Sequence, residues 1–231
     1  SCNRFFLKSC CKIFCYILNI INFPNNLLDK IVTIKPLVRE DIYKLKDFSK
    51  SNKKFTILII GGSQSANIFD YNLKNSIVNI SKKNSIKIIQ QTSNENISNL
   101  KDFYSQNQIE NKIFNFDKNF ADTIQEVDLC ITRAGASTLA ELSLVKIPFI
   151  AVPLPTSKDN HQFKNADFYK KKDCCWIIEQ IFFEEKIEDL LNDIISNKTD
   201  YFKKKENLKK LNYQNTWINV NQKILKILNE N

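Results

Sequence analysis

The chain has 231 residues, 43% of them hydrophobic, which is enough for one large or two small domains with a buried core. Its net charge of +9, from 34 basic and 25 acidic residues, favours an anionic membrane surface or an anionic substrate, although a general enrichment in lysine explains the charge equally well. No combined aromatic and basic motif of an RNA-binding module is present, so nucleic acid is not an expected partner.

Membrane-spanning and metal-binding classes are also disfavoured. The apolar stretch 5–23 contains Lys8 and Lys12, which make it too polar for a spanning helix, and it lacks the cleavage site of a signal peptide. The seven cysteines and the single histidine show no zinc-ligand spacing, so we expect reduced thiols, no metal, no cofactor and a cytoplasmic location. Because the sequence contains no methionine, we interpret Ser1 as an internal position of a longer gene product.

Apolar runs alternate with helix-type patterns along most of the chain, which predicts an α/β fold with a doubly wound parallel sheet. We expect strands at 13–18, 30–34, 55–60, 85–91, 112–116, 129–132, 149–152 and 174–178. Helices are expected at 3–12, 40–48, 63–80, 94–106, 120–126, 136–145, 161–172, 183–196 and 200–229.

The first two predicted strands have no complete sheet around them. We therefore interpret residues 1–35 as the last part of a preceding domain, residues 36–215 as a complete α/β domain, and residues 216–231 as a C-terminal helix.

All three glycines stand at strand-to-helix turns, with Gly61 and Gly62 in one turn and Gly135 in another. Average usage of about 7% would give roughly sixteen glycines. Glycine at such a turn allows the backbone to approach a ligand closely or to take a positive φ. Because both turns open helices and lie at the carboxyl ends of strands, we expect them to converge on one phosphate-bearing ligand.

The first turn continues into Ser63, whose hydroxyl can bond an oxyanion or simply cap the following helix. The second turn is more informative. The N–H groups of Ala136, Ser137 and Thr138 are expected to point out of a helix start, and Glu141 lies on the same face, where it can accept bonds from ribose hydroxyls. The alternative for Glu141 is a solvated residue near the positive end of the helix dipole. Together these residues predict a nucleotide diphosphate as ligand.

A third cluster follows a loop held by Pro153 and Pro155. His161 and Gln162 there suit hydrogen bonding to sugar hydroxyls; the alternative is an ordinary helix N-terminus capped by Asp159. No nucleophile is found as partner for the histidine, so a catalytic triad is not indicated.

In their order and spacing, these motifs resemble glycosyltransferase family 28, and specifically its GlcNAc transferases of peptidoglycan synthesis. The resemblance implies a GT-B fold, in which two Rossmann-like domains enclose the active site. Residues 1–35 would then end the N-terminal acceptor domain, and residues 36–215 would form the donor domain. The implied reaction is an inverting transfer of GlcNAc from UDP-GlcNAc to undecaprenyl-diphospho-MurNAc-pentapeptide on the cytoplasmic face of the inner membrane, with an anionic membrane surface as partner.

The resemblance also implies roles for individual residues. Arg39 of the linker contacts the donor, Ser63 and residues 136–138 hold the diphosphate, and the main chain at Asp117 contacts uracil. Glu141 binds the ribose, and His161 and Gln162 bind GlcNAc. The implied substrate-binding residues are Arg39, Ser63, Asp117, Ala136, Ser137, Thr138, Leu139, Ala140, Glu141, His161 and Gln162.

Three departures from the family pattern are present. Ser65 replaces a third glycine, Gln90 replaces a histidine, and the proline of the linker stands one residue further from Arg39. The acceptor loop and the histidine proposed as base belong to the family's N-terminal domain, so no catalytic residue is predicted within these 231 residues. The alternatives are another nucleotide-sugar transferase, such as a diacylglycerol glycosyltransferase, or a non-catalytic donor-binding subunit that needs a membrane partner.

Overall fold

The computed structural model describes residues 6–15, 23–34, 36–45, 54–61, 67–211 and 217–229. The chain forms two compact units, one of residues 1–40 and 214–231 and the other of residues 41–213. The C-terminal helix thus groups with the N-terminal segment, which the sequence did not indicate. The assignment of residues 1–35 and 36–215 to acceptor and donor domains stays a prediction.

In the first unit, strand β1 (Ile13–Cys15) pairs in parallel with β2 (Ile31–Thr33), as expected. A 3₁₀ helix, η1 (Asn25–Lys30), precedes β2, and α11 (Trp217–Asn229) completes the unit. The Nζ of Lys223 in α11 donates a hydrogen bond to the carbonyl of Thr33 over 2.8 Å, which ties the C-terminal helix to β2.

The predicted helix at 3–12 is wrong over its described part. The N–H groups of Ser9 and Cys10 both donate to the carbonyl of Phe6, which makes a single turn. The Nζ of Lys30 then binds the carbonyls of Lys8 and Cys10, at 3.2 and 2.8 Å. This side chain occupies acceptors that a continuing helix would need for its own N–H groups.

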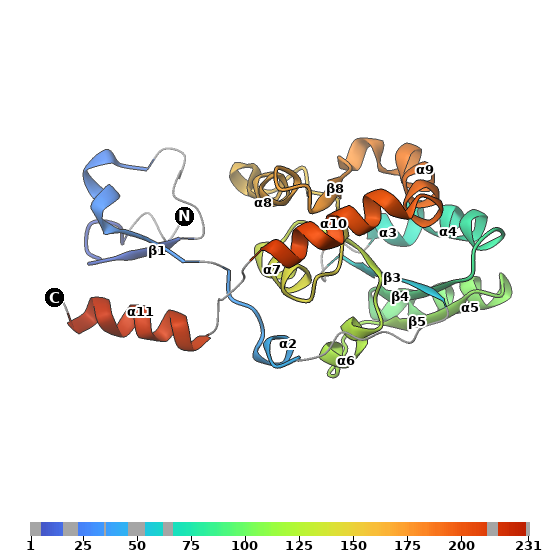
Figure 1. Cartoon of the computed structure of the whole chain (residues 1–231), viewed down its shortest axis with the longest axis horizontal. Coiled ribbons are helices and arrows are strands. Elements are labelled where there is room, and N and C mark those ends of the chain that lie inside the picture. Colours follow the sequence, from blue (N-terminus) through green and yellow to red (C-terminus); the bar gives the residue numbers. More distant parts are fainter. Residues whose placement is uncertain are drawn as a thin grey trace. The chain divides into compact units, whose positions relative to one another are not determined.

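The second unit is built on a six-stranded parallel sheet with the order β5-β4-β3-β6-β7-β8, which confirms the predicted α/β fold (Figure 1). All six strands were expected from the sequence. Their bounds are Phe55–Ile60 for β3, Ile86–Gln91 for β4, Glu110–Phe114 for β5, Leu129–Thr132 for β6, Phe149–Ala151 for β7 and Cys175–Ile177 for β8.

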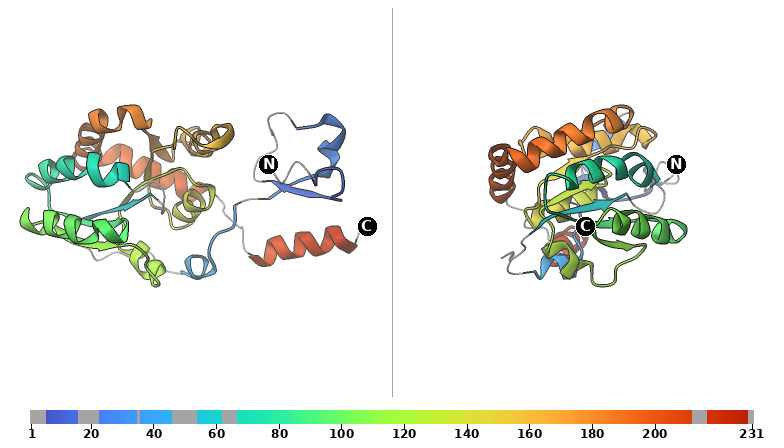
Figure 2. Two further views of the ribbon diagram at one scale, coloured as in Figure 1. Left: turned by 180° about the vertical axis from the view of Figure 1, so that it is seen from behind. Right: turned by 90° about the vertical axis from the view of Figure 1, so that its right-hand side faces the viewer.

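Helices cover both faces of this sheet (Figure 2). The helices from residue 40 to residue 210 have the bounds Glu40–Tyr43 for α2, Asn67–Asn72 for α3, Lys74–Ser81 for α4, Ile97–Gln106 for α5, Phe120–Gln125 for α6, Ala136–Leu144 for α7, His161–Lys170 for α8, Phe183–Ser196 for α9 and Lys198–Lys210 for α10. Three further 3₁₀ turns are η2 (Asn94–Asn96), η3 (Lys158–Asn160) and η4 (Gln180–Phe182). None of the helices in the described ranges has the length and apolar character that a bilayer crossing requires.

Several predicted boundaries need correction. The helix expected at 200–229 is two helices, α10 and α11, and α10 ends at Lys210. The helix expected at 40–48 ends at Tyr43. The helix expected at 63–80 is two helices, α3 and α4, that meet at Leu73.

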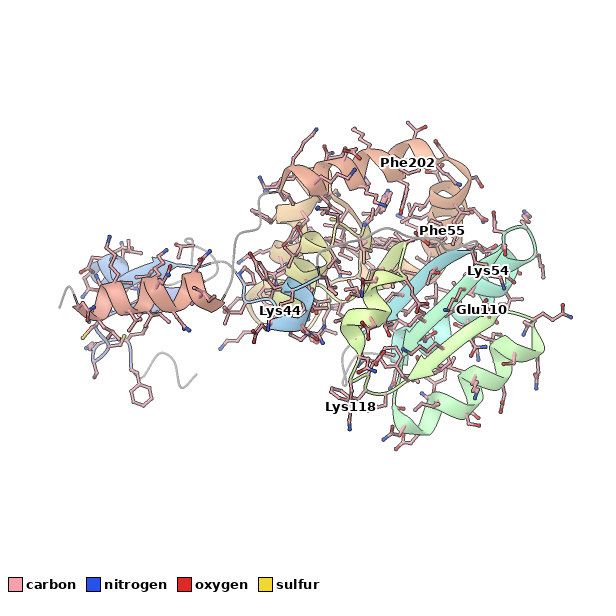
Figure 3. All side chains as sticks on the ribbon, turned by 60° about the horizontal axis from the view of Figure 1, so that its bottom comes forward. Lys44, Lys54, Phe55, Glu110, Lys118 and Phe202 are labelled. Carbon is pink, nitrogen blue, oxygen red and sulfur yellow. The ribbon has the colours of Figure 1, made fainter. Side chains whose placement is uncertain are left out.

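Strand β5 begins at Glu110, two residues before the expected start at 112. The carboxylate of Glu110 pairs with Lys54 at 2.9 Å (Figure 3). It also pairs with Lys87 of β4 at 3.5 Å, so the strand starts in a polar stretch that has no apolar pattern. The hydrogen bond from Lys54 lowers the pKa of Glu110.

The main core lies on one face of the sheet. Ile57 and Ile59 of β3 and Ile131 of β6 point to this face and pack with α3, α4, α5 and α9. Phe69 and Phe183, on α3 and α9, meet edge to face with ring centroids 5.5 Å apart. Each fully buried isoleucine or phenylalanine contributes about 1.5–3 kcal/mol.

The opposite face is covered by α7 and α8, as right-handed crossovers require. Phe149 of β7 packs there against Tyr169 of α8, with ring centroids 5.4 Å apart. Cys130, Cys174 and Cys175 are buried and free, as expected, and burial raises the pKa of Cys175 to about 12. These thiols are therefore unreactive packing groups.

A buried ion pair fastens α10 to the turn between α8 and β8. Lys204, whose side chain is 6% exposed, donates to Asp173 at 2.6 Å and lies 3.3 Å from Asp200. Its ammonium also stands over the ring of Trp176, 4.8 Å from the centroid. The hydrogen bonds from Lys204 and Lys203 lower the pKa of Asp173, which has a positive φ of 53°.

We expect Asp173→Asn to destabilise this domain by about 1–2 kcal/mol, because asparagine tolerates the left-handed backbone but leaves the buried ammonium with one anionic partner. Urea unfolding measures the change. Glu206→Gln is the matched control, since its pair with Lys209 is on the surface and should not affect the midpoint. An unchanged midpoint for Asp173→Asn would show that Asp200 alone compensates Lys204.

Candidate functional site

The strands that precede the two glycine turns are neighbours at the centre of the sheet. Strands β3 and β6 are neighbours in register, with Ile60 opposite Thr132, and the chain continues to Gly61 after β3 and to Gly135 after β6. This is the switch point of a doubly wound sheet, where ligands bind outside the carboxyl ends of the strands. Residues 62–66, which include Gly62, Ser63 and Ser65, lie outside the described residues, so the role expected for Ser63 stays a prediction.

Helix α7 begins directly after Gly135, which is its N-cap and supplies no side-chain cap. Among the described residues, the N–H groups of Ala136, Ser137 and Thr138 have no hydrogen-bond partner. They are therefore available to an anion, and the dipole of the helix favours one there.

The protein itself does not require glycine at position 135. The φ of Gly135 is −67°, which any residue adopts, so the positive φ considered from the sequence does not occur. A Cβ built on Gly135 would meet Oγ1 of Thr138 at 3.6 Å, an ordinary van der Waals contact. The close approach of a ligand, the other role expected for glycine from the sequence, stays a prediction.

Glu141, one turn into α7, is 7% exposed. The alternative of a solvated glutamate therefore does not hold. Leu139 and Ala140 are fully buried, and the N–H of Leu139 is bonded to the carbonyl of Gly135. Their side chains belong to the core, so any ligand contact from these two residues requires the main chain.

Helix α8 presents Gln162 to the turn that precedes α7. The Oε1 atom of Gln162 accepts hydrogen bonds from the N–H groups of Ala134, at 3.2 Å, and Leu154, at 3.0 Å. Asn165 of the same helix donates to the carbonyl of Ala134 at 3.0 Å. The structure thus brings the second and third sequence motifs together, and the amide nitrogen of Gln162 makes no hydrogen bond to any described residue.

His161 starts α8 and is exposed. Its Nδ1 donates a hydrogen bond to the carbonyl of Lys158 over 2.8 Å. Asp159 does not cap the helix, contrary to the alternative drawn from the sequence. The N-cap is Asn160, and both residues have a positive φ of 53°.

Asp117 follows β5 at the same end of the sheet. Its carboxylate accepts hydrogen bonds from Thr123 at 2.6 Å, Lys112 at 2.8 Å and the N–H of Asn119 at 2.9 Å. Burial by itself raises the pKa of Asp117, but these hydrogen bonds outweigh it and leave the pKa lowered. The side chain therefore fixes the loop and is not available to a ligand, while Phe116 beside it is 76% exposed.

Arg133 was not predicted as a functional side chain. It is 7% exposed, donates from Nη1 to the carbonyl of Val152 at 3.1 Å and from Nη2 to Gln180 at 2.7 Å, and stands over the ring of Phe69. Its Nε is buried with no hydrogen-bond partner among the described residues, and burial lowers the pKa of the guanidinium. A charged residue directly after the short strand Leu129–Thr132 was the available signal in the sequence.

A second buried network stabilises the carboxyl end of β4. The carboxylate of Asp70, on α3, accepts bonds from Gln90 at 2.8 Å, Thr92 at 2.6 Å and Asn96 at 3.0 Å. Tyr104 donates to the side-chain oxygen of Gln90 at 2.9 Å. Gln90, at the position where the family has histidine, is therefore a fully buried structural residue.

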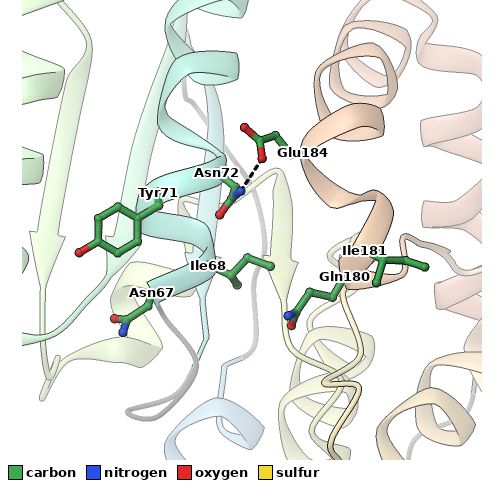
Figure 4. A pocket seen from close by; sticks show the side chains of 7 residues that line it. All are labelled: Asn67, Ile68, Tyr71, Asn72, Gln180, Ile181 and Glu184. Atoms are coloured by element: carbon green, nitrogen blue, oxygen red, sulfur yellow. Dashed lines mark hydrogen bonds between the residues drawn. The ribbon is translucent and has the colours of Figure 1, made fainter.

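A pocket of about 390 Å³ opens between α3 and the η4–α9 corner (Figure 4). Asn67, Ile68 and Tyr71 line it on one side, Gln180 and Ile181 line it on the other, and Asn72 bonds Glu184 across it at 2.7 Å. The amide of Gln180 connects this pocket to Arg133.

Arg39 belongs to the first unit and is exposed, so its expected contact with a donor stays a prediction. In the described part of the chain, no group of three or more residues is arranged to hold a metal ion.

The strand order and the turn at the switch point define the class of nucleotide-binding α/β domains. Residues 56–216 match the model of the glycosyltransferase family 28 C-terminal domain, which is more than half of the chain. The chain therefore belongs to glycosyltransferase family 28, and the resemblance drawn from the sequence is confirmed.

Similar proteins include the UDP-N-acetylglucosamine–N-acetylmuramyl-(pentapeptide) pyrophosphoryl-undecaprenol N-acetylglucosamine transferase of Pelagibacter ubique strain HTCC1062. It is 48% identical over 231 residues, which are 99% of this chain and 65% of that protein. The transferase of the same name from Rickettsia canadensis strain McKiel is 37% identical over 201 residues, 84% of this chain and 57% of that protein. The chain spans less than two thirds of the length of these relatives.

The crystal structure of Acinetobacter baumannii MurG has the same fold, with a TM-score of 0.69 and 21% identity over 83% of this chain and 60% of that one. This similarity confirms the expected GT-B-type domain.

We expect Asp117→Ala to accelerate hydrogen exchange of the amides of Asn119 and Thr123 by about tenfold, because the loop and the first turn of α6 lose their shared carboxylate. Exchange followed by mass spectrometry or NMR measures this. Asp122→Ala is the control, since Asp122 is exposed on the same helix. Equal protection in both variants would show that the main chain holds the loop without Asp117.

Proposed function

We propose that this chain is the donor-binding part of an inverting GlcNAc transferase. The donor is UDP-GlcNAc, and the acceptor is undecaprenyl-diphospho-MurNAc-pentapeptide. One observation carries the proposal. In a family 28 domain, the unpartnered N–H groups of α7 stand at the switch point of the sheet, next to a glycine that the protein itself does not require.

In this proposal the first turn of α7 holds the diphosphate. As the hydroxyl at C4 of MurNAc attacks C1 of GlcNAc from the face opposite UDP, negative charge builds up on the departing diphosphate. The N–H groups of Ala136, Ser137 and Thr138 and the dipole of α7 stabilise this charge without reorganising, which is the most effective form of electrostatic catalysis. Attack from the opposite face inverts the anomeric centre.

The other contacts follow from the positions of the side chains. Glu141 accepts bonds from the ribose, the main chain at Asp117 contacts uracil, and the exposed ring of Phe116 is available to stack on the base. The Nε2 of His161 and the amide of Gln162 face the sugar. Arg39 and Ser63 complete the donor contacts. The relative from Pelagibacter ubique, whose name includes the acceptor, is about half as long again as this chain. We assign the acceptor surface and the catalytic base to the part of such relatives that this chain does not cover.

The proposal is tested by calorimetry with UDP-GlcNAc and by a radiolabelled transfer assay with the lipid-linked acceptor. We expect the chain alone to bind UDP-GlcNAc and to transfer GlcNAc only when the additional part of a relative is supplied. Competition with UDP-glucose tests the alternative: if UDP-glucose binds more tightly than UDP-GlcNAc, a diacylglycerol glycosyltransferase is the better assignment. Absence of UDP binding would contradict the proposal, and transfer by the chain alone would show that it contains the base.

We expect Gly135→Ala to fold normally and to bind UDP at least about tenfold more weakly, because the added methyl group intrudes on the ligand and not on the protein. Thermal unfolding and calorimetry separate the two effects. A variant that binds UDP as the wild type does would show that the diphosphate is held elsewhere.

Glu141→Gln should weaken UDP binding by about 1.5–3 kcal/mol, the contribution of hydrogen bonds to a charged acceptor. Glu185→Gln, on the exposed surface of α9, is the control for loss of one negative charge. An unchanged affinity of the Glu141 variant for UDP would contradict the assignment of Glu141 to the ribose.

The excess of lysine supports an anionic membrane surface on the cytoplasmic side as the partner. Each basic residue near such a surface contributes about 1 kcal/mol, and the attraction fades within a Debye length of about 10 Å. We expect co-sedimentation with vesicles that contain anionic lipid at low salt, and loss of binding at high salt. Neutral vesicles are the control. Binding that ignores salt would point to the apolar stretch 5–23.

A further inference from the structure

The main chain of Ala134 is held from two sides by helix α8. Its N–H donates to Oε1 of Gln162 and its carbonyl accepts from Nδ2 of Asn165, at 3.2 and 3.0 Å. Ala134 is fully buried, so water offers its main-chain groups no alternative partner. Gln162 and Asn165 are three residues apart in α8 and therefore share one face of the helix.

The same oxygen of Gln162 connects two loops. Besides Ala134, which follows β6, it accepts a hydrogen bond from the N–H of Leu154, which follows β7, at 3.0 Å. One side-chain atom thus fixes the distance between the turn before α7 and the proline-rich loop. Ala134 is the residue before the N-cap Gly135, so any shift of Ala134 redirects the first turn of α7.

We infer that Gln162 and Asn165 are positioning residues that lock the turn at Ala134 and so aim the N–H groups of α7 at the diphosphate. This inference rests on the proposed function, and it gives Gln162 a role beyond the sugar contact expected from the sequence. The oxygen of Gln162 is committed to the main chain, and its amide nitrogen remains for the ligand.

The inference predicts different effects on ligand binding for substitutions of Gln162 and of its neighbour His161. Loss of the positioning contacts weakens every ligand that uses the diphosphate site, with or without a sugar. Among the described residues, the His161 ring is hydrogen-bonded within its own turn, to Lys158. His161→Ala should therefore weaken UDP-GlcNAc and leave UDP unchanged, whereas Gln162→Leu should weaken UDP as well as UDP-GlcNAc.

Calorimetry with UDP and with UDP-GlcNAc tests this on Gln162→Leu and Asn165→Leu, both of which remove the hydrogen bonds without adding charge. We expect about tenfold weaker binding of both ligands, the effect of leaving buried main-chain groups unpaired. Asp167→Asn is the control, because Asp167 pairs with Lys171 on the outer surface of the same helix.

Hydrogen exchange of the amides at 135–139, measured without ligand, provides an independent readout. Gln162→Leu should accelerate exchange there. Gln162→Glu should restore the wild-type rate, since a carboxylate oxygen accepts the same two hydrogen bonds. A simple loss of packing would not be rescued in this way. Gln162→Ser, which lets water replace the lost oxygen, replaces the leucine variant if that variant does not fold.

The outcomes are separable. If Gln162→Leu weakens the binding of UDP-GlcNAc but not that of UDP, the inference is wrong and Gln162 is a sugar contact. The inference is also wrong if hydrogen exchange of the amides at 135–139 is as fast in Gln162→Glu as in Gln162→Leu. If the wild-type chain does not bind UDP, the proposed function fails, and the exchange data alone then decide whether the two side chains hold the turn.

Discussion

The parallel pairing of β3 with β6 is the constraint on which the site depends. These strands are distant in sequence, and their register places Ile60 opposite Thr132. The chain continues to Gly61 after β3 and to Gly135 after β6, so one pairing brings both glycines to the same edge of the sheet. From this pair the chain leaves in opposite directions, from β3 to β4 on one side and from β6 to β7 on the other. A crevice at this point follows from topology, before any side chain is considered.

Polar side chains then fix the loops around that crevice. Arg133 spans from β6 to Val152 and Gln180, so its guanidinium ties the segments that follow three adjacent strands. Desolvating a guanidinium is unfavourable, and Arg133 offsets part of that cost with two hydrogen bonds and the ring of Phe69. Asp70 has the corresponding role at β4. Such networks rigidify loops because removing any one partner leaves a buried group unpaired.

Rigid loops suit the proposed chemistry. Charge develops on a leaving diphosphate during transfer, and donors that are already oriented stabilise it best. The apolar face of α7 packs on the sheet, its N-cap is a glycine, and α8 holds the preceding residue. In this arrangement the domain core, and not the ligand, determines the direction of the N–H groups.

Much of this protein is determined by local sequence. The apolar runs at β3, β4, β6 and β7 are short, buried and bounded by turns, so periodicity located them, and the scarcity of glycine marked both turns. The motif around Gly135 and Glu141 indicated the ligand class for the same reason, because spacing along one helix fixes a shared face.

Tertiary structure decided what periodicity does not encode. Strand β5 starts at Glu110, which pairs with Lys87 of β4 and whose carboxylate binds Lys54 and Lys87, and the ammonium of Lys30 binds carbonyls within the stretch predicted as a helix at 3–12. The burial of Arg133 and Glu141 depends on neighbouring strands and helices that are distant in sequence. Gln162 is the clearest case. Its residue type suited a sugar contact, but only the fold places its oxygen within hydrogen-bond distance of two loop N–H groups, because that distance is set by the packing of α8 on the sheet.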